Sequence, residues 1–191
     1  MQRISLLETA HDLVGACLQG GDAVIDATVG NGHDTAFLAE AVGAGGHVYG
    51  FDIQAKALHS TRQRLQQFGL AARVTLFEAS HADMLRLIPE PLHGRIKAVM
   101  FNLGYLPGAD KSLITQTGST LRAMDAARHL LAAPGIVTVL AYPGHAGGDE
   151  ETRCLTAWLG QLDSRRFSVE TLYSHHHQES APRLFVIKQT A

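Results

Sequence analysis

The sequence predicts an α/β fold in which a mainly parallel sheet carries helices on both faces. Short apolar, β-branched runs alternate with longer amphipathic runs along most of the 191 residues. A glycine turn separates the first strand from the helix after it, as in the β-α units of parallel sheets. Near the C-terminus two strand patterns have only the turn 178–182 between them, so these two strands must be antiparallel.

The elements follow in order along the chain. A helix is expected at about 4–18, with Ile4, Leu7, His11, Val14 and Leu18 on one face. Strands are expected at about 23–29, 47–53, 73–79, 96–103 and 135–142. Helices at about 34–42, 55–68, 82–88 and 113–132 connect them, the second with an inward face of Leu58, Thr61, Leu65 and Phe68. A helix near 149–162 and strands near 167–174 and 183–189 complete the chain.

Repeated β-α units require parallel neighbours with helices on both faces. The first five strands therefore form a parallel sheet, and the last two add a C-terminal antiparallel hairpin. This Rossmann-like arrangement is the topology expected of a class I methyltransferase.

Length and composition narrow the class of protein. Residues 1–191 suit one domain, and 46% hydrophobic with 18% charged residues is ordinary for a soluble α/β protein. A net charge of −2 argues against a global basic field for nucleic acid. Cys17 and Cys154 lack metal-ligand spacing and, with no signal peptide, predict a reduced, cytoplasmic protein. No apolar run approaches the length of a transmembrane helix.

The residues of the glycine turn indicate which class of ligand the protein binds. It reads Asp26-Ala27-Thr28-Val29-Gly30-Asn31-Gly32-His33-Asp34. Gly30 and Gly32 allow positive φ and close approach of the backbone to a ligand. A dinucleotide fingerprint would have a small residue where Thr35 stands, and two flanking carboxylates would repel a phosphate at the helix start. Asp26 and Asp34 instead suit a cationic ligand such as S-adenosylmethionine (SAM). The alternative is that Asp34 only caps the helix.

Two later strand ends extend this pocket. Asp52 lies 22 residues after Gly30, near the offset expected for a carboxylate on ribose hydroxyls, and Gln54 can add to it. The alternative for such an acid is a solvated turn. Ser80 and His81 would border the adenine, with a helix cap as the alternative for both and a surface histidine as another for His81.

The sequence resembles a known family, the SAM-dependent methyltransferases once labelled rRNA methylases. These are similar to the tRNA wobble-uridine enzymes that convert 5-aminomethyl-uridine to 5-methylaminomethyl-uridine. The segments that carry the resemblance are 26–35, 51–54, Ser80-His81, Asn102-Leu103-Gly104-Tyr105-Leu106-Pro107-Gly108 and Tyr142-Pro143-Gly144-His145. It implies a SAM pocket from the first three segments, including Asn31, and a substrate site for the tRNA anticodon loop from the last two.

The segment after the fourth strand predicts amine chemistry. Asn102-Leu103-Gly104-Tyr105 resembles the Asn-Pro-Pro-Tyr motif of amino methyltransferases, with Leu-Gly in place of Pro-Pro. An Asn oxygen can accept an N–H of the attacking amine, and Tyr105 can stack on a base. The alternative is a plain turn, because Asn and Gly favour turns.

An aliphatic aminomethyl group must lose a proton before it attacks. The candidate acceptors are His145, Tyr142, His11 and water. The alternatives are a surface histidine for His145 and a core histidine for His11, which matters only if its helix covers the pocket.

The remaining charged motifs are less specific. His175-His176-His177 predicts a surface strand end rather than a metal site, because alternate residues on a strand face opposite sides. Arg62, Arg64, Arg73 and Arg165-Arg166 suggest solvated faces, any of which could touch phosphates.

Other functions stay open at this point. They are methylation of rRNA or of a small amine, an NAD-dependent oxidoreductase, and a silent SAM-binding subunit. A domain this small also suggests a homodimer, whose second subunit would help to frame an anticodon loop.

Overall fold

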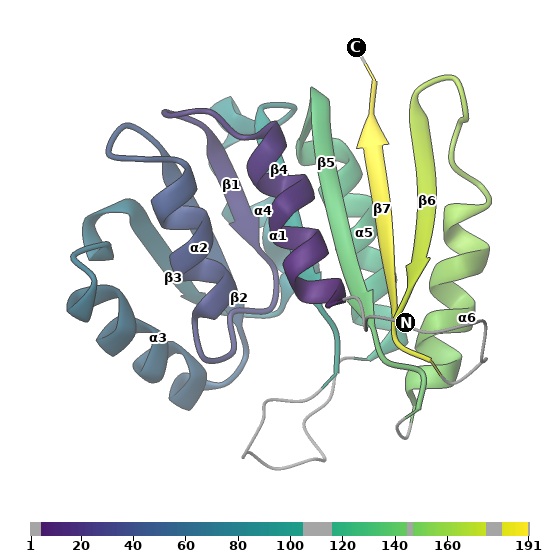
Figure 1. Ribbon diagram of the computed structural model, residues 1–191, viewed down its shortest axis with the longest axis horizontal. Helices are drawn as coiled ribbons and strands as arrows, with labels where there is room; N and C mark the ends of the chain where they lie inside the picture. The colour runs from purple at the N-terminus through teal and green to yellow at the C-terminus, as the bar shows by residue number, and fades with distance from the viewer. Residues whose placement is uncertain (1–4, 105–115, 145–146, 175–180, 191) are drawn as a thin grey trace.

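Seven strands form one sheet in the order β3-β2-β1-β4-β5-β7-β6 (Figure 1). The structure is a computed structural model, and it describes residues 5–104, 116–144, 147–174 and 181–190. The strands are β1 (Ala23–Asp26), β2 (His47–Asp52), β3 (Val74–Glu78), β4 (Ile96–Asn102), β5 (Leu131–Ala141), β6 (Phe167–Tyr173) and β7 (Arg183–Gln189). Neighbours from β3 to β5 are parallel, while β7 runs antiparallel to both β5 and β6. The predicted parallel sheet and terminal hairpin are confirmed.

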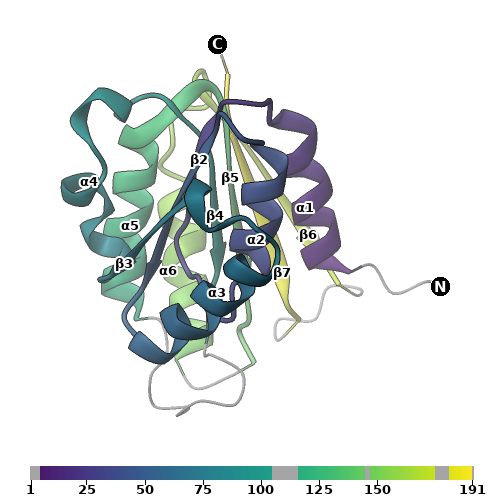
Figure 2. The same cartoon turned by 90° about the vertical axis from the view of Figure 1, so that its left-hand side faces the viewer.

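Helices cover both faces of the sheet (Figures 1 and 2). One face carries α1 (Leu6–Cys17), α2 (His33–Ala41) and α3 (Ala55–Gln67). The other face carries α4 (Met84–Leu87), α5 (Thr117–Leu130) and α6 (Gly148–Leu159). Short 3-10 turns η1 (Ala71–Arg73), η2 (His81–Asp83) and η3 (Glu90–Leu92) lie between these elements. None of the helices in the described segments is long and apolar enough to cross a bilayer.

Each face of the sheet has its own apolar core. Val24 of β1 packs in the layer under α1, α2 and α3, together with Leu38 and Leu65. Its neighbour Ile25 points to the opposite face and packs in the layer with Met124 and Leu155. Adjacent strand residues alternate in direction, so a central strand that is apolar on both sides needs helices on both.

The face that the first helix turns to the sheet overlaps the predicted face only in part. Its buried residues are Leu6, Ala10 and Val14, whereas Leu7 and His11 are only half-buried. Leu7 and Leu18 still pack against the core beside Val14, so the predicted stripe is confirmed in part, but the buried face is centred on Leu6 and Ala10 rather than on Leu7 and His11. These two positions lie one step around the helix, toward α2, because α1 packs on α2 as well as on β4, β5 and β7.

Two strand boundaries also differ from the prediction. Strand β1 ends at Asp26 rather than at residue 29, and the chain then turns through the glycine loop. Strand β5 begins at Leu131, whereas the preceding helix was expected to run to residue 132 and the strand to begin at residue 135. Its pairing with β4 jumps from Leu131 to Ile136. This irregularity takes Pro134, which has no N–H, out of the hydrogen-bond ladder.

Helix α3 confirms most of its predicted inward face. Leu58, Thr61 and Leu65 are buried, but Phe68 is 53% exposed and its predicted burial was wrong. The helix ends at Gln67, and Gly69 with φ 67° turns the chain away. The ring of Phe68 therefore lies outside the core.

The order in which strands are added to the sheet reverses direction at β1. From β1 the chain builds outward through β2 and β3, then returns to place β4 on the other side of β1. In open α/β sheets, ligands bind beyond the carboxyl ends of the strands at such a reversal. The predicted site segments after β1, β2, β4 and β5 all leave the sheet at this edge.

Candidate active site

The loop between β1 and α2 is held in one conformation by α3. Gly30 and Gly32 have φ values of 53° and 76°, which L side chains rarely adopt. A Cβ at Gly32 would lie 2.6 Å from Oγ1 of Thr61. That hydroxyl donates to the carbonyl of Gly30 at 3.1 Å. The backbone of the loop therefore lies directly against α3, and only glycine fits at position 32.

The carboxylate of Asp26 holds this loop to the start of α2 by two hydrogen bonds. Its side chain is buried, with one carboxylate oxygen accepting from the Thr28 N–H at 3.1 Å and the other from the Thr35 hydroxyl at 2.6 Å. Burial, with a further contribution from the charge of Asp34, raises the pKa of Asp26 to about 7. Asp26 thus lies at the predicted pocket, with both oxygens engaged by the loop and the helix.

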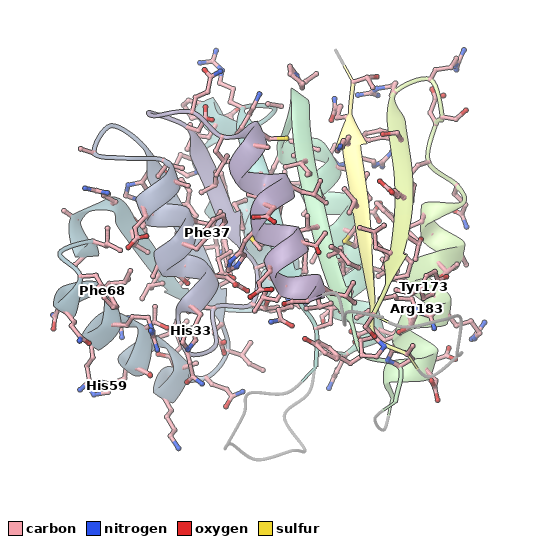
Figure 3. All side chains as sticks on the ribbon, viewed as in Figure 1. His33, Phe37, His59, Phe68, Tyr173 and Arg183 are labelled. Atoms are coloured by element: carbon pink, nitrogen blue, oxygen red, sulfur yellow. The ribbon has the colours of Figure 1, made fainter. Side chains whose placement is uncertain are left out.

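Asp34 contacts the first helix instead of capping its own. The N-cap of α2 is Gly32 and no side chain caps it, so the capping alternative was wrong. One Asp34 oxygen lies 2.6 Å from Nε2 of His11. The His11 ring stacks on Phe37, with centroids 4.1 Å apart, and Figure 3 labels Phe37 on α2. Helix α1 therefore reaches the start of α2 beside the β1–α2 loop, and His11 is a residue of this edge rather than of the core.

Asp52 ties the end of β2 to the glycine loop. It accepts from the Gly30 N–H at 3.0 Å and from the Gln54 N–H at 2.9 Å. Burial raises its pKa, while these backbone N–H groups lower it. Between them Ile53 is 56% exposed, an unusual place for a large apolar side chain. Asp52 is held in a fixed orientation and is not a freely solvated turn residue.

Ser80 and His81 follow β3, and their side chains lie in different environments. Ser80 is the N-cap of η2 and accepts from the Ala82 N–H at 3.2 Å, as its capping alternative predicted. His81 is buried, and both the surface and the capping interpretations of it were wrong. Its Nδ1 donates to the Ala27 carbonyl at 3.2 Å, while burial lowers its pKa and keeps the ring neutral. His81 therefore supports the start of the β1–α2 loop.

Asn102 is the last residue of β4, which pairs with β1, and Tyr142 follows β5, which pairs with β4. The Asn102 N–H donates to the Thr28 hydroxyl at 2.7 Å, so the end of β4 is joined directly to the β1–α2 loop. Tyr142 is half-buried, and burial together with the charge of Asp34 raises its pKa. Tyr105, His145 and 175–177 lie outside the described residues.

The charges at this edge favour a cationic ligand. Asp26, Asp34 and Asp52 lie around one loop, and no Lys or Arg in the described part of the chain forms an ion pair with any of them. Arg64 reaches the same loop but donates to the Asn31 carbonyl, at 2.8 Å, and not to a carboxylate. A phosphate would meet carboxylates here, whereas an ammonium or sulfonium would be stabilised.

Sequence reasoning missed several supporting residues. Thr28 joins the loop to Asn102, Thr61 fills the space beside Gly32, and Arg64 holds Asn31. The expected solvated face for Arg64 and Arg73 was wrong, because each donates to a backbone carbonyl of the neighbouring unit. In the sequence, the one indication of these contacts is Thr61, a polar residue on the otherwise apolar inward face of α3.

Known proteins with similar sequences or structures agree on one family. The model of the family described as "Putative rRNA methylase" matches residues 48–188. A protein of Arabidopsis thaliana named tRNA (mnm(5)s(2)U34)-methyltransferase, chloroplastic, is 42% identical over 159 residues. The match covers 79% of this chain and 57% of that relative, so the chain spans little more than half the relative's length.

Two solved structures match over their full extent. A protein of Clostridium thermocellum described as a "putative rRNA-methylase" has a TM-score of 0.92 and 40% identity, covering 99% of this chain and 100% of that one. A "putative methyltransferase" of Streptococcus mutans, solved in complex with SAH, has a TM-score of 0.85 and 32% identity, covering 98% and 99%. The class I methyltransferase fold predicted from the element order is confirmed.

Proposed function

Because the chain belongs to the family described as "Putative rRNA methylase", we propose that it is a SAM-dependent N-methyltransferase that acts on tRNA. The observation that carries the proposal is the 2.7 Å hydrogen bond from the Asn102 N–H to Thr28. It joins an amine-orienting segment to a loop shaped for a cationic cofactor. The amine-methyltransferase motif at Asn102 and the negative charge of the loop thus support the same reaction, the transfer of a methyl group from SAM to an amine.

The residues of the loop fit SAM, which supplies a methyl group activated by its sulfonium. Asp34, with Asp26 beneath it, would face the cationic methionine end, beside the backbone of Gly30, Asn31 and Gly32. A side chain at position 32 would overlap Thr61 and so displace the loop that is proposed to hold the cofactor.

The other half of the cofactor would lie at the ends of β2 and β3. Asp52 has its carboxylate oriented by two backbone N–H groups, and each oxygen retains a lone pair for a ribose hydroxyl. Gln54 would add to this contact. The exposed side chain of Ile53 offers an apolar surface for a purine, bordered by Ser80 and His81.

We propose that the substrate is 5-aminomethyl-(2-thio)uridine at the wobble position and the product its 5-methylaminomethyl form. The name of the Arabidopsis relative supports this nucleoside. Asn102 would accept an N–H of the amine through its side-chain oxygen, so that the nitrogen lone pair faces the methyl carbon. Tyr105 would stack on the base.

The ammonium form of the substrate must first lose a proton. Burial and Asp34 raise the pKa of Tyr142, so its hydroxyl stays protonated and would donate a hydrogen bond rather than take the proton. His11, His145 and water remain as the acceptors, with His11 already oriented by Asp34. The expected cytoplasmic location and homodimer also stand as proposals. Sedimentation velocity of the purified chain, with and without tRNA, tests the homodimer.

A methyl-transfer assay with isotope-labelled SAM tests the function. The substrates are tRNA bearing 5-aminomethyl-uridine, rRNA from the same cells, and a free aminomethyl nucleoside. The proposal predicts label in the tRNA alone. Label only in rRNA, as the family's description would suggest, or only in the free nucleoside would overturn the tRNA assignment.

A further inference from the structure

The segment 53–77 has an unusual charge for this chain. It contains Lys56, Arg62, Arg64 and Arg73 and no Asp or Glu, although the whole protein has a net charge of −2. Most of this segment is α3, which begins three residues after Asp52. A basic helix therefore starts at the edge of the sheet where the candidate site lies.

Three basic side chains of α3 lie on its exposed face, and a fourth, Arg64, is half-buried. Lys56, His59 and Arg62 are exposed, while Leu58 and Leu65 on the opposite side are buried. The same outward face also carries the uncharged donors and acceptors Gln63, Gln66 and Gln67. Figure 3 shows His59 on the outer side of the helix, away from the sheet. No carboxylate interrupts this face along the helix.

Arg64 fastens this face to the cofactor loop. Its guanidinium donates to the Asn31 carbonyl at 2.8 Å and lies 3.1 Å from Nε2 of His33, which is exposed at the start of α2 (Figure 3). Because a guanidinium only donates, His33 accepts through Nε2 and presents an N–H on its other ring nitrogen. We call Lys56, His59, Arg62, Arg64 and His33 the α3 surface.

Several other arginines of the protein are neutralised locally. Arg86, Arg128, Arg153 and Arg165 each lie within 4.0 Å of a carboxylate two or three residues away in the sequence. Within the described segments, Lys56, Arg62 and Arg64 take part in no such ion pair. The positive charge of α3 is therefore available to an external anion.

We propose that the α3 surface docks the sugar–phosphate backbone of the RNA substrate, an inference that rests on the proposed function. Lys, Arg, His and Gln side chains are the groups that bind phosphate and ribose without reading sequence. Two groups of opposite charge then adjoin the same loop, the carboxylates Asp26, Asp34 and Asp52 and the basic α3 surface. The carboxylates of the loop receive a cationic cofactor and repel phosphate, while α3 attracts the polyanion and sets its position relative to the pocket.

The experiment compares the salt dependence of tRNA binding in two double variants. Lys56→Gln/Arg62→Gln removes two charges from the α3 surface and keeps good helix formers. Arg153→Gln/Arg165→Gln removes two exposed, ion-paired charges elsewhere and is the matched control. Binding is measured by fluorescence anisotropy with purified tRNA between 50 and 200 mM KCl, and SAM binding is measured by calorimetry.

The inference predicts a tRNA affinity about tenfold lower for Lys56→Gln/Arg62→Gln, with a salt slope shallower by roughly 1.5. The control keeps the wild-type slope, and both variants keep wild-type SAM affinity. Equal slopes and affinities for the two folded variants would overturn the docking surface while wild-type methylation of tRNA still upheld the function. Failure of the wild-type protein to bind or methylate tRNA would overturn both.

Discussion

At the scale of single residues, Asp34 connects three ionisable groups of the site. It contacts His11 directly, and its charge raises the pKa values of both Asp26 and Tyr142. The side chain comes from α2, its partner from α1, and the other two groups from the ends of β1 and β5. One carboxylate thus couples four elements at the place where the cationic end of SAM is proposed to lie.

The variant Asp34→Asn should separate binding from stability. Asn keeps an oxygen for His11 but loses the charge, so SAM affinity should fall by about 1.5–3 kcal/mol while the apo protein unfolds at nearly the wild-type temperature. Calorimetric titration and thermal unfolding measure the two effects. In the control variant His11→Phe, the ring can still stack on Phe37 but no longer contacts Asp34. Loss of apo stability without loss of SAM affinity would leave Asp34 a structural role only.

Because of Asp26, the free energy of unfolding should decrease as the pH rises. Its pKa in the folded protein is about 7, against an ordinary value of 3.8, so the folded state holds a proton that the unfolded chain has released between these limits. Stability should therefore fall from about pH 4 to about pH 7. In Asp26→Asn this contribution is absent, and the unfolding free energy of the variant relative to wild type should rise over the same interval.

Urea unfolding across this pH range measures the difference. Asp163→Asn is the control, because Arg165 lowers the pKa of the exposed Asp163 and that acid is already ionised in both states above pH 4 or so. Its difference from wild type should stay flat. Parallel profiles for wild type and Asp26→Asn would mean that Asp26 is ionised throughout.

At the scale of elements, the β1–α2 loop depends on α3 and β4. Thr61 of α3 contacts the loop from one side, and the Asn102 N–H at the end of β4 reaches Thr28 from another. The loop is therefore preorganised for a ligand before the ligand arrives. Substitutions in α3 that move Thr61 should weaken cofactor binding without touching the cofactor.

Gly32→Ala tests this close packing against a matched glycine. Gly32 and Gly43 have φ values of 76° and 65°, but a Cβ at Gly43 meets nothing within 4 Å whereas one at Gly32 overlaps Thr61. Gly43→Ala should cost about 1–2 kcal/mol from backbone strain alone. Gly32→Ala should cost a further 1–3 kcal/mol or so and lower SAM affinity. Chemical denaturation and calorimetry give both numbers, and equal losses for the two variants would refute the packing argument.

The sequence predicted local features of these elements well and distant contacts poorly. The offset of Asp52 from Gly30 and the cap at Ser80 follow from short-range rules, and both residues lie at the predicted edge. The contact of His11 with Asp34 depends on how α1 rotates against α2, which hydrophobic spacing alone does not determine. Likewise the early start of β5 depends on its pairing with Ile96, not on its own residues. Both failures come from tertiary packing overriding local preference.

At the scale of the whole molecule, the order β3-β2-β1-β4-β5-β7-β6 brings the separate motifs to one edge. The predicted sequence of parallel strands and terminal hairpin was sufficient to expect this meeting. It was not sufficient to show which basic residues flank the site, because the sequence does not show which carboxylate an arginine contacts. The ion pairs of Arg153 and Arg165 distinguish them only in the folded protein.

The central claim is that Asn102 orients an amine of tRNA beside the SAM pocket. The most direct measurement is single-turnover methylation of tRNA bearing 5-aminomethyl-uridine at saturating enzyme, with the product nucleoside identified by mass spectrometry. We expect wild type to place one methyl group on the aminomethyl nitrogen. Asn102→Ala should bind SAM and tRNA as wild type does but lose at least about tenfold in rate, because the lost interaction aligns the amine for attack. Wild-type turnover by Asn102→Ala, or a methyl group on a ring carbon or ribose oxygen, would contradict the account.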